Sequence, residues 1–362
     1  MNSGKLAVAL GNTIMTRYPD PDQIPYMVWC YVQGYVLKGL EKLFDATGDP
    51  RYLNYIRRFA DQHVSADGNL HGFTGCSLDD MMAGSVIVAI YRKTGEEKYR
   101  RAAEIIRRAF DDYPRNRDGG FWHARSLPGE MWIDGVFMGQ MFLAAYGAYI
   151  GDADYCFNET AHQIITFANH CLKGETGLYL HAYHEPRTVS WADPHNGLSP
   201  EVWSEGLGWY GLILVETLNL MPRDHPDRMK VVQILVDLVE GLRKTQDSDT
   251  GLWYQVVDKG DRPDNWHDTS GSAMFVYTIQ GAINLGLVPP EIYLPVVKKG
   301  YAGMLSKAIY TPDGLVDIVD ACDGVCVQNS YADYINYPKT VNAKEAVGGV
   351  LWAATSVEFR KG

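Results

Sequence analysis

Six stretches of this sequence are apolar at nearly every position, and each is long enough to form a helix. They cover residues 28–44, 79–91, 134–149, 204–218, 268–283 and 343–357. A helix that is apolar on all sides belongs in a core rather than at a surface. Small residues within them, such as Gly139, Gly211 and Gly348, allow neighbouring helices to approach closely. The chain must therefore bury about six helices against one another.

Amphipathic segments alternate with these apolar stretches. They cover residues 47–63, 94–110, 151–170 and 226–244. In the second of them, Ile105, Ile106 and Phe110 recur at helical spacing while Arg101 and Arg108 form a charged face. Buried helices that alternate with amphipathic ones predict an all-α (α/α)6 barrel, a toroid of six helical hairpins. We expect residues 1–362 to form a single catalytic domain of this kind, with the inner helices parallel and their N-termini at one end.

Glycine-containing turns recur between the helices and predict short β segments in the loops. Each turn is followed by a brief alternating stretch that is typical of an extended chain. The turns lie at residues 67–73, 118–124, 175–182, 249–256 and 312–319. Their spacing of roughly 50 to 75 residues leaves room for one helical hairpin per repeat.

Composition excludes several classes of function. The formal net charge of −11 argues against a nucleic acid or an anionic membrane as partner. We also expect no membrane span and a cytoplasmic location, because the first residues lack a secretory signal and no stretch is long and apolar enough to cross a bilayer. The 6 cysteines are scattered, which predicts reduced thiols in the core. No spacing of His or Cys indicates a metal site, and no glycine-rich loop indicates a nucleotide, so we expect no metal and no cofactor.

Several of the apolar helices begin with an acidic residue. These residues are Asp79 and Asp80, Asp134, Glu205, Asp268 and Glu345. N-capping, in which a carboxylate accepts backbone N–H bonds, is the simplest explanation for any one of them, and we expect it for Asp268 and Glu345. Asp134 is different, because a lone ionised acid in so apolar a run costs several kcal/mol unless it is paired, hydrogen-bonded or protonated.

Aromatic residues and histidines gather beside the same helix starts. Trp132 precedes Asp134, Trp203 and Trp209 flank Glu205, and His123 and His181 occupy matching places in the turn repeats. If the inner helices share a direction, these side chains converge on one rim. Stacking faces combined with carboxylates and imidazoles are typical of sugar-binding clefts. The pattern predicts an acidic, aromatic-walled cleft for a carbohydrate.

The motifs at this rim resemble those of a known enzyme family. The family is that of the unsaturated rhamnogalacturonyl hydrolases, glycoside hydrolase family 105, which is related to the unsaturated glucuronyl hydrolases. The motifs of this chain that resemble it are "MWIDGVFMG", "GFWHA", "GLYLHAYHE", a W-S-x-G-x-G-W run and "HDTSGSAMF". The resemblance extends from "CYVQG" to "AKEAVGG". It implies an (α/α)6 barrel that acts on small oligosaccharides released by polysaccharide lyases, as in pectin degradation. Such oligosaccharides carry a C4=C5 double bond in their terminal uronate.

The resemblance also implies roles for individual residues. Asp134 matches the general acid/base and Asp79 the second catalytic carboxylate, with Asp80 as the neighbouring alternative. The residues that match the substrate-binding set are Tyr31, His123, Trp132, His181, Trp203, Glu205 and Trp209. Glu205 departs from the family, which commonly has Arg there. Arg125, Arg187 and Lys339 are candidates to supply the missing cation.

The chemistry implied by the resemblance explains an acid in an apolar wall. The substrate is an enol ether, and hydration of its double bond begins with a proton delivered to C4. Burial and a second carboxylate both favour the protonated form of Asp134, whereas the helix N-terminus favours the anion. We expect burial and like charge to prevail once substrate closes the site.

Three alternatives remain open from the sequence. An unsaturated glucuronyl hydrolase acting on another lyase product is favoured by the Glu205 departure. A sugar epimerase on the same barrel would use paired histidines at the rim. A non-catalytic sugar-binding toroid would use the acids only as helix caps. Oligomeric state is not encoded in any motif that we recognise.

Overall fold

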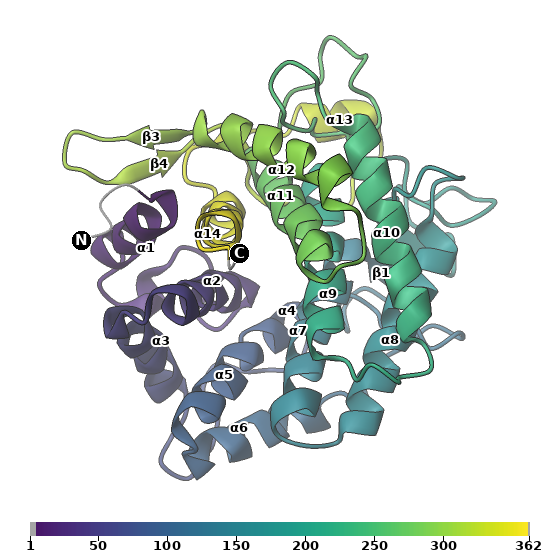
Figure 1. Cartoon of the computed structure of the whole chain (residues 1–362). Coiled ribbons are helices and arrows are strands. Elements are labelled where there is room, and N and C mark those ends of the chain that lie inside the picture. The colour runs from purple at the N-terminus through teal and green to yellow at the C-terminus, as the bar shows by residue number, and fades with distance from the viewer. Residues whose placement is uncertain (1–4, 361–362) are drawn as a thin grey trace.

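Two concentric sets of helices make up the computed structural model of the chain, which describes residues 5–360 (Figure 1). The inner helices are α2 (Tyr31–Thr47), α4 with α5 (Leu78–Met82 and Gly84–Thr94), α7 (Ile133–Tyr149), α9 (Ser204–Leu220), α11 (Thr269–Asn284) and α14 (Lys344–Glu358). The outer helices are α1 (Leu6–Arg17), α3 (Pro50–His63), α6 (Glu97–Arg108), α8 (Ala153–Cys171), α10 (Arg228–Thr245) and α12 (Pro290–Leu305).

The inner helices close into a ring. Helix α2 packs on α5, α5 on α7, α7 on α9, α9 on α11, α11 on α14, and α14 returns to α2. Figure 1 shows α14, in yellow, beside the purple helices α1 and α2, so the two ends of the chain meet at the closure. The predicted (α/α)6 barrel is confirmed. The ends of the predicted 1–362 domain, residues 1–4 and 361–362, lie outside the described residues.

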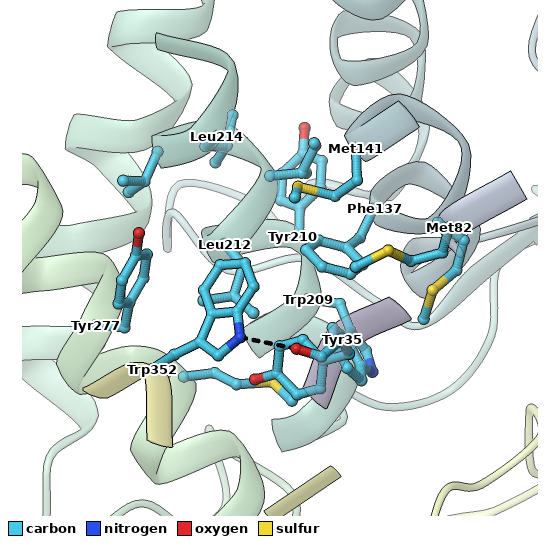
Figure 2. Close-up of a cluster of buried hydrophobic side chains, with 14 of the residues drawn as sticks. Tyr35, Met82, Phe137, Met141, Trp209, Tyr210, Leu212, Leu214, Tyr277 and Trp352 are labelled. Atoms are coloured by element: carbon cyan, nitrogen blue, oxygen red, sulfur yellow. Dashed lines mark hydrogen bonds between the residues drawn. The ribbon is translucent and has the colours of Figure 1, made fainter. Parts of the chain in front are cut away.

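Hydrophobic side chains fill the centre of the ring. Tyr35, Phe137, Trp209 and Trp352 meet there, with ring centroids of Tyr35 and Trp209 4.4 Å apart and those of Phe137 and Trp209 4.8 Å apart. Trp352 Nε1 donates to the backbone oxygen of Tyr35 at 3.0 Å (Figure 2). Each such side chain stabilises the fold by about 1.5–3 kcal/mol through removal from water. The barrel is thus closed at its middle, and a ligand can enter only from an end.

Two helix predictions need adjustment. The predicted helix over residues 79–91 is interrupted at Ala83, where α4 ends before α5 begins. The Ser85 hydroxyl donates to the carbonyl of Met82 at 2.7 Å, a bond that competes with the regular helical pattern. Helix α2 also packs closely against this break, since a Cβ on Gly34 of α2 would lie 3.0 Å from the Ala83 backbone. The predicted helix over 28–44 begins only at Tyr31.

Short β segments lie in the loops as expected, but most of the paired strands lie outside the predicted turns, which are closed mainly by single bridges. Antiparallel pairs join β1 (Glu130–Trp132) to β2 (Ala182–His184), β3 (Ala308–Tyr310) to β4 (Val316–Ile318), and β5 (Ala321–Cys322) to β6 (Lys339–Thr340). Single bridges close other turns, as between Val64 and Leu70, and between Arg115 and Phe121. The 3-10 helix η1 (Pro21–Gln23) and the short helix α13 (Tyr331–Ile335) complete the described elements.

Two further observations concern the whole described chain. Within residues 5–360, none of the helices combines the length and the hydropathy needed to cross a membrane. All 6 cysteines are free, and Cys76 and Cys326 are exposed, so the prediction of core thiols is wrong for these two. Both lie in loops, which the scattered spacing of the cysteines could not reveal.

Candidate active site

A pocket opens at the end of the barrel where the inner helices begin. Its walls come from the starts of α2, α4, α7, α9 and α14 together with the loops between them. The lining residues are Tyr26, Tyr31, Asp79, His123, Trp132, Asp134, Met138, Trp203, Glu205, Trp209, Asp323, Gly324, Val325, Cys326 and Lys344. The prediction that the inner helices start at one end is therefore correct.

Four acidic residues occupy the same place in their helices. Asp79, Asp134, Glu205 and Glu345 are each the second residue of α4, α7, α9 and α14. Side chains of an α-helix tilt toward its N-terminus, so carboxylates at this position point toward the end of the barrel where the pocket opens. The repeated architecture thereby directs several carboxylates to one pocket.

Asp134 has a carboxyl oxygen without a hydrogen-bond partner. Its Oδ1 is buried, and no described residue donates to it; His181 Nε2 lies 4.0 Å away. Burial raises the pKa of Asp134, whereas the charge of His123 and the backbone N–H groups of Asp134 and Gly135 oppose the rise. A buried acceptor left free in this way is available to a ligand.

Asp79, rather than Asp80, reaches the pocket. Its Oδ2 lies 3.8 Å from His123 Nε2, and burial, aided by the charge of Asp134, raises its pKa to about 6. Asp80 instead accepts bonds from the Thr74 hydroxyl and, at 3.1 Å, from the backbone N–H of Cys76. Asp80 therefore shapes the loop before α4.

His123 is held against Trp132 above the start of α7. The two rings stack with centroids 4.3 Å apart and an interplanar angle of 15°. Gly135 permits this approach, because a Cβ there would lie 2.8 Å from His123 Nδ1. The glycine that follows Asp134 in the sequence thus makes room for the imidazole.

His181 is completely buried and linked to Tyr334 of α13. Its Nδ1 lies 2.7 Å from the Tyr334 hydroxyl, which itself accepts the backbone N–H of Gln328 at 3.3 Å. The Tyr334 hydroxyl can therefore donate its one proton to Nδ1 of His181. The ring proton of the neutral imidazole is then on Nε2, which faces Asp134. Burial holds the pKa of His181 well below its usual value, so the ring is neutral. The β1–β2 pair sets this arrangement, with Trp132 opposite Ala182, the residue after His181.

Aromatic side chains form the remaining walls. Tyr31 meets Trp209 edge to face at 6.2 Å, and Trp203 lies with its ring centroid 4.5 Å from that of His181. Trp132 Nε1 donates to Glu130 at 2.8 Å, whereas the buried Nε1 of Trp203 has no partner among the described residues. The geometry thus brings all nine predicted site residues together, eight as lining residues and His181 directly behind Asp134.

Glu205 lies at the bottom of this site and is almost fully buried. Its Oε2 is 2.9 Å from the Ser270 hydroxyl, which in turn lies 2.7 Å from Asp268 Oδ2. Burial raises the pKa of Glu205 well above its usual value, and the charges of Glu345 and Asp268 add to the effect. This environment therefore favours the uncharged form of Glu205.

The three cations suggested as substitutes for the missing arginine do not reach the pocket. Arg125 pairs with Asp112 at 2.9 Å, and Arg187 donates to the carbonyl of His195 at 2.5 Å. Lys339 is exposed, with its ammonium 5.5 Å from the centre of the Trp266 ring. Arg125 and Arg187 lie in loops and Lys339 lies in the two-residue strand β6, and the sequence pattern specifies the course of none of these segments. These candidates are wrong. The cation that does line the pocket is Lys344.

The N-cap prediction is correct for Asp268 and wrong for Glu345. Asp268 precedes α11 and accepts the backbone N–H groups of Ser270 and Gly271 at 3.2 and 2.8 Å. Glu345 lies one residue inside α14, too far along to cap it, and instead accepts the Tyr31 hydroxyl at 2.6 Å. Its other oxygen is buried without a described partner.

Sequence reasoning missed the loop of residues 323–326, together with Tyr26 and Lys344. The loop was notable only for its two nearby cysteines, and no periodicity marks residues outside helices. Lys344 stands directly before Glu345 at a helix start, which is the one signal that could have identified it. Among the described residues, no group of three or more His, Cys, Asp or Glu side chains is arranged to hold a metal ion.

Comparison with known proteins identifies the family. The signature of Glycosyl Hydrolase Family 88 matches residues 7–361. The chain belongs to this family. Unsaturated rhamnogalacturonyl hydrolase YesR of Bacillus subtilis (strain 168) is 24% identical to it over 316 residues, which cover 86% of this chain and 84% of YesR. An unsaturated 3S-rhamnoglycuronyl hydrolase of Alteromonas sp. (strain LOR) is 22% identical over 308 residues, covering 80% of this chain and 70% of that protein.

A solved structure gives the same result. A family 105 glycoside hydrolase of C. acetobutylicum ATCC 824 superposes with a TM-score of 0.92 at 31% identity, covering 98% of this chain and 99% of that one. The resemblance inferred from the motifs is confirmed. As a member of Family 88, the protein is a glycoside hydrolase.

Proposed function

We propose that this enzyme releases the terminal 4,5-unsaturated galacturonate from oligosaccharides that a lyase has cut from rhamnogalacturonan. The observation that carries the proposal is the buried, unpartnered Oδ1 of Asp134, which faces a pocket walled by Trp132 and Trp203. The name of YesR supports the choice of substrate. A uronate ring fits such a pocket by stacking on the aromatic faces.

In the proposed reaction, protonated Asp134 delivers its proton to C4 of the double bond. Positive charge then develops at C5, where the ring oxygen shares it, and water adds at C5 while its proton returns to the Asp134 carboxylate. The resulting hemiketal opens, and the hemiacetal left at C1 expels the neighbouring sugar as an alcohol. Because the double bond is hydrated, no carboxylate attacks the anomeric carbon, unlike in the two-carboxylate glycosidases.

The surroundings of Asp134 suit this role. Burial raises its pKa, so a bound substrate that excludes the remaining water favours the protonated form further. Asp79 shares the pocket with a pKa of about 6, so the pair still holds a proton in mildly acidic solution. The Nε2–H of His181 points toward Asp134 and can stabilise the carboxylate that remains after proton transfer.

The test follows the ultraviolet absorbance of the conjugated double bond. Wild-type enzyme should abolish the absorbance of an unsaturated rhamnogalacturonan disaccharide. Asp134→Asn should reduce the rate by at least about 10²–10⁴-fold, since general acid catalysis is worth that much, while substrate binding and folding persist. Wild-type-like turnover by Asp134→Asn would remove the mechanism.

A second substrate class is favoured by one observation. The pocket has an acid at position 205, where the motif resemblance implies Arg, and this departure favours a glucuronyl-derived substrate. Turnover of a glucuronyl but not a galacturonyl disaccharide would assign the enzyme to this alternative. Isomerisation of a reducing sugar without loss of absorbance would instead indicate an epimerase, and tight binding without turnover a sugar-binding toroid.

A further inference from the structure

Lys344 is the only lysine or arginine among the described residues that line the pocket. It is the first residue of α14, and its side chain is 13% exposed. Its ammonium lies 2.6 Å from Asp323 Oδ1 and 3.3 Å from Glu345 Oε1. An ammonium carries three N–H donors, so one donor is left after these two contacts. A positive group with a spare donor therefore stands at the wall of an otherwise acidic pocket.

Hydrogen-bond geometry shows how the acid at position 205 avoids repelling an anionic substrate. The Ser270 hydroxyl has one proton and lies within hydrogen-bond distance of both Asp268 and Glu205. If both carboxyls were ionised, one of these two contacts would join two acceptors. One of the carboxyl groups must therefore carry a proton.

The backbone decides which carboxyl is protonated. Asp268 accepts three backbone N–H groups, from Ser270 at 3.2 Å, Gly271 at 2.8 Å and Cys322 at 3.0 Å. Such bonds favour the ionised form. Glu205 has no comparable donors among the described residues, so it holds the proton and donates it to Ser270, which donates in turn to Asp268. The other oxygen of Glu205 is then a neutral acceptor.

We propose that Lys344 binds the carboxylate of the terminal uronate, while uncharged Glu205 accepts a hydrogen bond from one of that sugar's hydroxyl groups. The inference rests on the proposed function and adds to it the group that recognises the substrate's charge. The cation of the site thus stands at the start of α14, while the acid at the start of α9 is neutralised by its own hydrogen bonds.

Paired substrates test the role of Lys344. Dissociation constants are measured by calorimetry on the Asp134→Asn background, for an unsaturated uronyl disaccharide and for its methyl ester, which lacks the charge. Lys344→Met should weaken binding of the acid about 10- to 100-fold, the value of a hydrogen bond to a charged group, and should weaken binding of the ester far less. Lys344→Arg should restore most of the preference for the acid.

Lys339→Met is the matched control, because it removes one positive charge from an exposed lysine outside the pocket. It should leave the acid-to-ester preference unchanged. Equal losses for acid and ester in Lys344→Met, or no loss in either, would overturn the assignment. Circular dichroism of each variant shows whether it is folded, and Lys344→Gln is used if Lys344→Met does not fold.

Infrared spectroscopy tests the protonation of Glu205 without relying on activity. At pH 7 the wild type should show the carbonyl stretch of a protonated carboxylic acid that disappears in Glu205→Gln. Absence of this difference, with only a carboxylate band lost, would overturn the neutral state of Glu205.

Failure of this inference differs from failure of the proposed function. If wild-type enzyme leaves the absorbance of every unsaturated uronide unchanged, the proposed function and this inference both fall. If wild-type enzyme acts on one of them but Lys344→Met keeps the full preference for acid over ester, only this inference is wrong.

Discussion

Asp79 and Asp134 face the same pocket but differ in what stabilises their charge. Asp134 lies beside the backbone N–H groups at the start of a helix of 17 residues, and these favour its ionised form. Asp79 belongs to a helix of only 5 residues, and the negative charge of Asp134 raises its pKa. In the free enzyme the more tightly held proton is therefore on Asp79, and the two carboxyls titrate as a pair.

The titration of this pair predicts the pH dependence of the reaction. The proposed mechanism needs one proton on the pair, and the pKa of Asp79 is about 6. We expect kcat/KM to be greatest in mildly acidic solution and to fall about tenfold per pH unit above about pH 6, because kcat/KM reports ionisations of the free enzyme. Initial rates of absorbance loss between pH 4.5 and about pH 8.5 measure this profile. A flat profile through pH 8 would contradict proton delivery by the pair.

The same shift predicts that Asp79 destabilises the fold at neutral pH. Its pKa rises from 3.8 in the unfolded chain to about 6 in the folded one, so the unfolded state releases its proton first as pH rises. The free energy of unfolding should fall between about pH 4 and pH 6. Asp79→Asn should recover on the order of 1–3 kcal/mol at pH 7 and almost nothing below pH 4. Urea unfolding at the two pH values measures the difference.

Asp80→Asn is the control for this prediction. The charge of Asp80 makes only the smallest of the named contributions to the pKa of Asp79, and Asp80 accepts loop hydrogen bonds from Thr74 and Cys76 that an amide would weaken. Its replacement should therefore give no gain in stability at pH 7. Equal gains from Asp79→Asn and Asp80→Asn would show that burial of Asp79 is not the cause.

At the scale of elements, the helices were predictable and the loops that complete the site were not. Apolar residues on every side of 134–149 and 204–218 predict buried helices, and a ring of parallel inner helices predicts that Asp134 and Glu205 face the same end of the barrel. Helix α13 and the loop of residues 323–326 have no period to recognise, because their course is set by contacts with distant segments. Tyr334 reaches His181 across 153 positions of sequence, and only the folded chain reveals this contact.

Helix α13 contributes to the site by fixing the tautomer of His181. Tyr334→Phe removes the hydroxyl that occupies Nδ1, so the ring is free to carry its proton there and present a bare Nε2 to Asp134. We expect kcat/KM to fall about 10- to 100-fold through loss of a hydrogen bond to the charged carboxylate. Nitrogen chemical shifts of labelled histidine should show the change of tautomer, which a purely structural effect would not produce.

Tyr331→Phe is the matched control on the same helix. Its hydroxyl donates to Asp264 at 2.9 Å on the exposed side, away from the pocket. Its removal should leave both the rate and the His181 shifts unchanged. Similar losses in the two variants would mean that α13 acts only through its general stability.

At the scale of the whole molecule, the chain's two ends hold the ring closed. Glu358, at the end of α14, accepts the backbone N–H groups of Leu6 and Ala7 at 2.8 and 3.0 Å and so caps α1. Trp352 of α14 packs on Tyr35 of α2 inside the ring (Figure 2). Because α14 also presents Lys344 to the pocket, ring closure and the substrate site depend on the same helix.

This arrangement predicts that the chain unfolds as a single domain. Fluorescence and far-ultraviolet circular dichroism should report one coincident transition in urea. Trp352→Ala should lower the free energy of unfolding by about 3–5 kcal/mol, because it opens a cavity at the closure of the ring and removes the hydrogen bond that Trp352 Nε1 donates to the Tyr35 carbonyl. The transition should move to lower urea concentration but remain single.

Met229→Ala is the control, at a side chain that is 71% exposed on an outer helix, and it should change the urea transition little. Two separate transitions in the wild type or in Trp352→Ala would contradict this prediction. They would show that the remaining helices stay folded after α14 has come away from the ring.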